Sequence, residues 1–404
     1  MNKALQFIKV RGVWCFAMAV VLSSLFLGPL SFLSSLYQPA ILVCLICLCT
    51  KLNKANVGWA ELLLIMTCGL SIILGDPLPI FNSWMRLGLF CIVLFVTTPI
   101  VSSPSIDKFR VRLFNWISLI CVFAGAGSFI AYFLGINYMR SYSGAYSTHL
   151  GGSFGGLTMQ SMLLGPLAAL GMLRCVYIAI QKYEQEAKSS YFLYCSAFAC
   201  FLSVLMASSR GAAGAALIAT CYMTYSLLKR KMGKLIKIVL FLSCLSVPLA
   251  PVVGYFSSGL VAKQEANMES GGTFNSREYI WEARLEEWKD SPVYGVGFSA
   301  QRIITHEATL RTGQVEPGTS YGAVFAMTGT LGGALFLFIL GSACVSKKGF
   351  SPSMPQVYLV FFVFHMFTEG YVYAGGSPLC FIFWLCIGAA CATKRLPQLQ
   401  NIIA

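Results

Sequence analysis

The residues best suited to chemistry gather in one long polar stretch, residues 257–320, of an otherwise apolar chain. Arginine binds phosphate oxygens through a planar fork of donors, and a carboxylate or an imidazole can accept a proton. Any reaction of this protein is therefore expected beside this stretch, in contact with water. It carries Arg277, Arg284, Arg302, Arg311, Trp281, Trp288, Glu278, Glu282, His306, Glu307 and Glu316.

Within that stretch, the segment NSREYIWEARLEEWKDSP predicts a short helix. Asn275 and Glu278 have the spacing of a capping box, and Pro292 ends the helical pattern.

One face of this helix is expected to alternate guanidinium and indole groups. Arg277, Trp281, Arg284 and Trp288 follow one another at steps of four, three and four residues, so they lie on the same side. Such a face suits a pyrophosphate joined to a sugar, because arginine grips phosphate and aromatic rings stack on sugars. An equally good interpretation is an amphipathic lid with its tryptophans at the lipid interface and its arginines paired to neighbouring glutamates.

Four further residues outside the stretch are candidates. Arg210, in the tight turn SSRGA, and Glu369, near the end of an apolar run, are costly at a membrane unless they are paired or used. Arg210 is expected to bind phosphate, although an arginine that reaches to the interface would fit as well. Glu369 is expected to accept a proton, the alternative being a structural ion pair. Arg86 and Arg140 are expected to contact sugar or lipid.

Histidine and cysteine give no sign of a metal site or another cofactor. His149, His306 and His365 lack metal-like spacing, and the sixteen cysteines fall in apolar runs as small filler residues. No cofactor and no metal are therefore expected.

Composition predicts that a membrane surrounds these candidates. Of 404 residues, 57% are hydrophobic and 11% charged, which favours an all-α polytopic membrane domain covering residues 1–404. The net charge of +14 lies in clusters between apolar runs, so it indicates membrane topology and not nucleic acid. About twelve spans are expected, at 12–31, 38–50, 58–75, 83–101, 113–135, 155–179, 191–208, 211–228, 237–256, 320–344, 356–374 and 377–393.

The basic clusters also predict the orientation. With both termini in the cytoplasm, the clusters around residues 51–54, 108–112, 182–188, 229–237, 347–348 and 394–395 all lie inside. The first apolar run is interpreted as a retained anchor, because no clear cleavage site follows it. A large loop, residues 257–319 between the ninth and tenth spans, then lies in the periplasm.

The order of these motifs resembles the O-antigen ligase and polymerase superfamily. The resemblance rests on SSRGA between two spans, on a loop helix that ends in W-x2-SPVYGVGF, and on GTSYGAVFAMTGTLG. It implies glycans carried on undecaprenyl pyrophosphate as donor and acceptor, with Arg210, Arg277 and Arg284 binding the donor pyrophosphate. Ligases of the superfamily carry a histidine where this chain has Gly318, so the resemblance is closer to polymerases of exopolysaccharide or O-antigen repeats.

The resulting hypothesis is a metal-independent polymerase of lipid-linked oligosaccharide repeats in the bacterial inner membrane. Glu369, Glu316 and His306, in that order, are the expected proton acceptors, and Trp281, Trp288, Arg86 and Arg140 the sugar or lipid contacts. Membrane lipid and a chain-length regulator are the expected partners. The alternatives are a ligase that transfers glycan to lipid A core and, in another class, a transporter or flippase of lipid-linked sugars.

Overall fold

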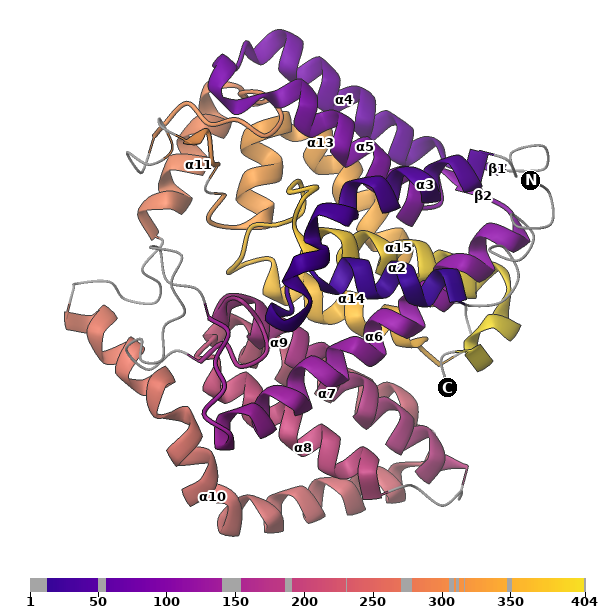
Figure 1. Cartoon of the computed structure of the whole chain (residues 1–404), viewed down its shortest axis with the longest axis vertical. Coiled ribbons are helices and arrows are strands. Elements are labelled where there is room, and N and C mark those ends of the chain that lie inside the picture. Colours follow the sequence, from indigo (N-terminus) through magenta and orange to yellow (C-terminus); the bar gives the residue numbers. More distant parts are fainter. Residues whose placement is uncertain are drawn as a thin grey trace.

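A computed structural model describes residues 13–49, 56–139, 154–185, 191–229, 231–269, 278–304, 309, 312–315, 317–346 and 351–402. Most of these residues are helical (Figure 1). The helices are α2 (Val13–Ser23), η1 (Gly28–Leu36), α3 (Tyr37–Cys49), α4 (Trp59–Gly75), η3 (Pro79–Phe81), α5 (Ser83–Thr97), α6 (Pro104–Phe133), α7 (Ser161–Glu184), α8 (Tyr191–Met206), α9 (Arg210–Leu228), α10 (Met232–Glu269), α11 (Glu278–Asp290), α13 (Ser320–Cys344), α14 (Met354–His365), α15 (Pro378–Arg395) and η4 (Pro397–Ile402). Strands β1 (Asn56–Val57) and β2 (Val101–Ser102) form one antiparallel ribbon.

The helices confirm the predicted all-α membrane class. Among the described residues, seven helical segments are long and apolar enough to cross a bilayer, and five shorter apolar helices accompany them. Each predicted span overlaps one of these helices, although α2 ends at Ser23 and α14 at His365, well before the predicted ends at 31 and 374, and α6 begins at Pro104 and not at 113. The short span predicted at 38–50 is continuous with the 3₁₀ turn of η1, and together they make the apolar segment Gly28–Leu48.

The start of the polar stretch also differs from the prediction. The polar stretch was expected to leave the membrane as a loop at residue 257, yet α10 continues to Glu269. Residues 257–269 contain good helix formers and no proline, so the helix continues after its apolar part has ended. The short loop helix is confirmed as α11, which ends at Asp290, two residues before Pro292.

Helix α15 forms the centre of the bundle. Almost all of its residues between Pro378 and Thr393 are buried, and α5, α6, α13 and α14 pack around it. Figure 1 shows α14 and α15 in the middle, with α4 and α5 on one side and α7, α8 and α10 on the other. Small residues allow close helix packing. A Cβ on Gly171 of α7, for example, would lie 2.7 Å from the carbonyl oxygen of Cys121 in α6.

Charged side chains, two of them buried, tie together the end of the bundle opposite α11. Arg395 of α15 donates two hydrogen bonds, of 2.8 and 2.9 Å, to Asp107 of α6. The fully buried Arg110 donates to the carbonyls of Phe95, Val96 and Val101 and so caps α5. Residues of two predicted basic clusters, 108–112 and 394–395, therefore meet at one end of the molecule.

Helix α13 is broken at Gly329, whose φ of 63° and ψ of −167° are not helical. The segment that follows α11 completes the interrupted hydrogen bonds. Val296 and Gly297 donate to the carbonyls of Ala326 and Met327, at 2.9 and 3.2 Å. In return, Pro292 accepts from Thr330 at 2.8 Å and Val293 accepts from Leu331 at 3.3 Å. Irregular backbone inside a bundle needs such partners, since lipid offers none.

Candidate functional site

The turn at residues 366–371, which follows α14, joins three parts of the chain and carries Glu369. The backbone N–H of Ser320, at the start of α13, donates to the carbonyls of Met366 and Glu369, both at 3.0 Å. The Ser320 hydroxyl donates to the Glu369 carbonyl at 2.7 Å and accepts from the N–H of Tyr371 at 3.1 Å. The backbone of Glu369 is thus held against the end of the polar stretch.

The same turn meets the start of α9, where Arg210 is the first residue. Gly211 lies so close that an added Cβ would stand 2.8 Å from the Cβ of Thr368. The residues that precede Gly211 and follow Thr368 are Arg210 and Glu369, and both are half-buried. Two candidates 159 positions apart in the sequence therefore lie at one junction, which we call the α9–turn junction (residues 209–211 and 366–371).

The start of α9 adds partial positive charge beside Arg210. Ser208 has a left-handed φ of 52°, and the Ser209 side chain caps the helix by accepting from the N–H of Ala212 at 3.4 Å. A helix N-terminus carries partial positive charge, which adds to the charge of the guanidinium. The junction thus combines a cation, a helix N-terminus and a carboxylate.

The face predicted on α11 is present, but it packs against α13 and the residues leading into it. The ring of Trp281 faces Gly318, and the Cβ and Cγ of Arg284 lie over Gly322. Trp288 donates from its indole nitrogen to the Thr330 hydroxyl at 3.3 Å. Because Gly318 is two residues from Ser320, α11 lies next to the 366–371 turn.

Arg284 is buried and forms an ion pair with Glu287, a residue that the sequence analysis did not single out. Only 1% of Arg284 and none of Glu287 is exposed, and their side chains approach to 2.7 Å. Burial raises the pKa of Glu287, while the charge of Arg284 opposes that rise. The i,i+3 spacing of this arginine and glutamate was the available signal in the sequence.

Arg86 and Arg302 hold backbone near the same end of the bundle. Arg86 donates to the Gly313 carbonyl at 2.7 Å and to the Ser299 hydroxyl at 3.2 Å. Arg302 donates to the Gly75 carbonyl at 3.4 Å. These contacts fix the chain before and after residues 305–308, and a role of Arg86 toward sugar or lipid stays a prediction.

Four predicted site residues, Arg140, Arg277, His306 and Glu316, lie outside the described residues. Within the described part, no three His, Cys, Asp or Glu side chains group closely enough to hold a metal ion. A buried histidine of α14 was missed as a neighbour of the site: the Nδ1 of His365 lies 3.2 Å from the Tyr371 hydroxyl. Its position in an apolar run made it indistinguishable from core residues.

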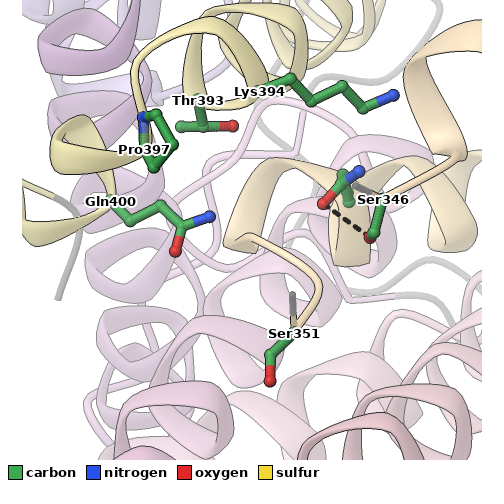
Figure 2. Close-up of a pocket in the computed structure, with 7 residues that line it drawn as sticks. Ser346, Ser351, Thr393, Lys394, Pro397 and Gln400 are labelled. Carbon is green, nitrogen blue, oxygen red and sulfur yellow. Dashed lines mark hydrogen bonds between the residues drawn. The ribbon is translucent and has the colours of Figure 1, made fainter. Parts of the chain in front are cut away.

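A small pocket lies at the far end of the bundle, between the ends of α13 and α15 and the start of α14 (Figure 2). Most of the residues that line it have polar side chains, and none of them belongs to the candidate site. The lining residues are Ser346, Ser351, Gln356, Thr393, Lys394, Pro397 and Gln400.

Comparison with known proteins finds a match for part of this arrangement. Residues 195–337 match a family model described as O-Antigen ligase. No curated protein matches the chain. The matched region runs from α8 into α13 and includes Arg210, α11 and the break at Gly329. The resemblance to the O-antigen ligase and polymerase superfamily is thereby confirmed, and the protein is a multi-pass membrane protein that carries this domain.

Proposed function

We propose that this protein polymerises oligosaccharide repeats carried on undecaprenyl pyrophosphate. The observation that carries the proposal is the α9–turn junction, where Gly211 and Thr368, the sequence neighbours of Arg210 and Glu369, approach each other at the edge of the matched domain. The proposed reaction takes place at the periplasmic face of the bacterial inner membrane. Both termini lie in the cytoplasm, and residues 257–319 form the periplasmic loop of a single membrane domain.

In the proposed reaction, a hydroxyl of the terminal sugar of one lipid-linked repeat attacks the anomeric carbon of the growing glycan. The bond between that carbon and the pyrophosphate oxygen breaks, and undecaprenyl pyrophosphate leaves. Arg210 binds the departing pyrophosphate together with Arg277, because charge that develops on a leaving group is best stabilised by fixed cations. Trp281 and Trp288 contact the sugars or the lipid, as do Arg86 and Arg140.

The proton of the attacking hydroxyl passes to Glu369, with Glu316 and His306 as the next candidates. Two hydrogen bonds from Ser320 to the Glu369 carbonyl support this choice, since a base must be held in place. No step of this scheme calls for a metal ion or a nucleotide sugar.

Ligation of glycan to lipid A core is the second candidate, favoured by the description of the matching family. Polymerisation is preferred because Gly318 stands where ligases of the superfamily carry a histidine. Gly318 has a φ of 68° and an added Cβ would lie 2.7 Å from Ile280, so this position suits glycine alone.

A transporter of lipid-linked sugars would need an unwound helix that opens onto its substrate. The break in α13 supports the enzyme better, because the backbone of residues 292–297 already fills it.

The surface glycan of a deletion strain tests the proposal. Loss of a polymerase leaves the lipid A core capped by single repeats, whereas loss of a ligase leaves no surface glycan and lets lipid-linked polymer accumulate. Short glycans that return to full length with the wild-type gene, but not with Arg210→Ala, would support polymerisation at this site. A chain-length regulator, if it acts with this protein, would change the spread of lengths and not their presence.

A further inference from the structure

Helix α11 and the segment after it are joined by one buried carboxylate, that of Glu287. Its Oε1 accepts from the backbone N–H groups of Arg302 and Ile303, at 2.6 and 2.8 Å. Its Oε2 lies 2.7 Å from a guanidinium nitrogen of Arg284. Arg284 in turn donates to the Ile303 carbonyl at 3.1 Å. A closed network thus links residues 284, 287, 302 and 303.

The network fixes α11 at one end of its buried face. At the other end, Ile280 and Trp281 pack against Gly318, and Gly322 lies under the aliphatic part of Arg284. Gly318 and Ser320 belong to the chain that holds the Glu369 carbonyl. The orientation of α11 against residues 318–322, which adjoin the α9–turn junction, therefore depends on contacts that Glu287 completes.

The burial of this pair makes its charge balance important. Each member is almost completely removed from water, and an isolated charge in such a place is strongly destabilising. An ion pair on the surface would contribute little to stability. This carboxylate, by contrast, is buried and also accepts hydrogen bonds from two backbone N–H groups.

We infer that Glu287 is a positioning residue, which neutralises Arg284 and pins residues 302–303 so that α11 presents Trp281 beside the α9–turn junction. This inference rests on the proposed function and replaces the sequence-based expectation that Arg284 binds the donor pyrophosphate. Arg284 acts through Glu287 on the position of α11, while Arg210 and Arg277 bind the donor pyrophosphate. The chain leaving Ile303 runs on to residues 305–308, which include the candidate base His306.

A double-mutant cycle on the purified full-length protein tests this assignment. Wild type, Arg284→Gln, Glu287→Gln and the double variant are compared for Tm and for kcat and donor KM in elongation of lipid-linked repeats. Glu286→Gln serves as the control, because Glu286 is exposed on the same helix. In the double variant no charge is buried, and the two glutamine side chains can still accept from residues 302–303 and donate to the Ile303 carbonyl.

Each single variant breaks the buried Arg284–Glu287 pair and keeps one of its charges, so we expect a Tm lower by several degrees and kcat reduced about tenfold or more. The double variant should recover Tm and return kcat to within about threefold of wild type, with donor KM unchanged. Glu286→Gln should match wild type in all three measurements.

A double variant with recovered Tm but with donor KM still raised about tenfold would overturn the inference, because the charge of Arg284 would then serve the donor. A Tm that does not recover would overturn it as well, since the pair would not be what holds α11. If the wild-type protein transfers no glycan, the proposed function fails, and the Tm values alone still decide whether Glu287 and Arg284 act as a pair.

Discussion

Replacing Gly329 by alanine tests the broken helix on which the candidate site is built. The φ and ψ of Gly329 belong to a region that only glycine adopts readily. An added Cβ would overlap the backbone carbon and oxygen of Val293 and would lie 2.5 Å from the nitrogen of Tyr294. Residues 293–294 would have to move, and the hydrogen bonds from Thr330 and Leu331 would be lost with them.

The cost of Gly329→Ala follows from these contacts. Backbone strain of this kind costs about 1–3 kcal/mol. The two hydrogen bonds contribute about 1 kcal/mol each. We therefore expect a loss of about 3–5 kcal/mol in unfolding free energy, together with loss of activity. Gly341→Ala in the same helix is the matched control, because a Cβ at Gly341 meets nothing within 4 Å.

Thermal unfolding of both variants in the same detergent gives the comparison. Gly341→Ala should be as stable as wild type or slightly more stable, since alanine favours a helix by up to about 1 kcal/mol over glycine. Equal Tm values for Gly329→Ala and Gly341→Ala would refute the account of how residues 292–297 complete α13.

Further expectations concern the donor site, the base, the opposite end of the bundle and the topology. Arg210→Lys should be nearly as damaging to polymer length as Arg210→Ala, because lysine keeps the charge but loses the bidentate fork; normal polymer from the lysine variant would mean that charge alone matters. Glu369→Gln should lower turnover by about 10²–10⁴-fold with little change in donor KM or Tm, and full activity would pass the role of base to Glu316 or His306. Asp107→Asn leaves Arg110 and Arg395 without their shared carboxylate, so the free energy of unfolding should fall by about 3 kcal/mol. Asp290→Asn, at an exposed position, is the control and should leave it unchanged. Reporter fusions at Lys188, Lys231 and Lys347 should report cytoplasm and those at Thr148 and Thr309 periplasm, and exchanged signals at Thr148 and Lys231 would invert the topology.

The helices could be predicted from sequence because lipid imposes a length and an apolar composition on every span. The extension of α10 to Glu269 could not, since beyond the apolar part helical propensity alone decides where the helix ends. The break at Gly329 was also hidden: several glycines lie in that span, and only contact with residues 292–297 selects one of them for a positive φ.

The candidate site, like the fold, could be predicted only in part from the sequence. Topology places Arg210 and Glu369 at the same end of the bundle, but their contact through Gly211 and Thr368 depends on how α9 packs on α14. Helical periodicity grouped Trp281, Arg284 and Trp288 correctly on one face. Periodicity does not show that this face is turned toward α13. The i,i+3 spacing of Arg284 and Glu287 allows an ion pair, but only the structure shows that both side chains are buried.

The most direct test of the central claim is elongation by the purified protein of undecaprenyl-pyrophosphate-linked repeats, with no nucleotide sugar and no other protein present. The account predicts a ladder of lipid-linked glycans for the wild type and none for Arg210→Ala folded to the same Tm. Absence of a ladder from well-folded wild-type protein, with transfer of glycan seen only when lipid A core is supplied, would contradict it.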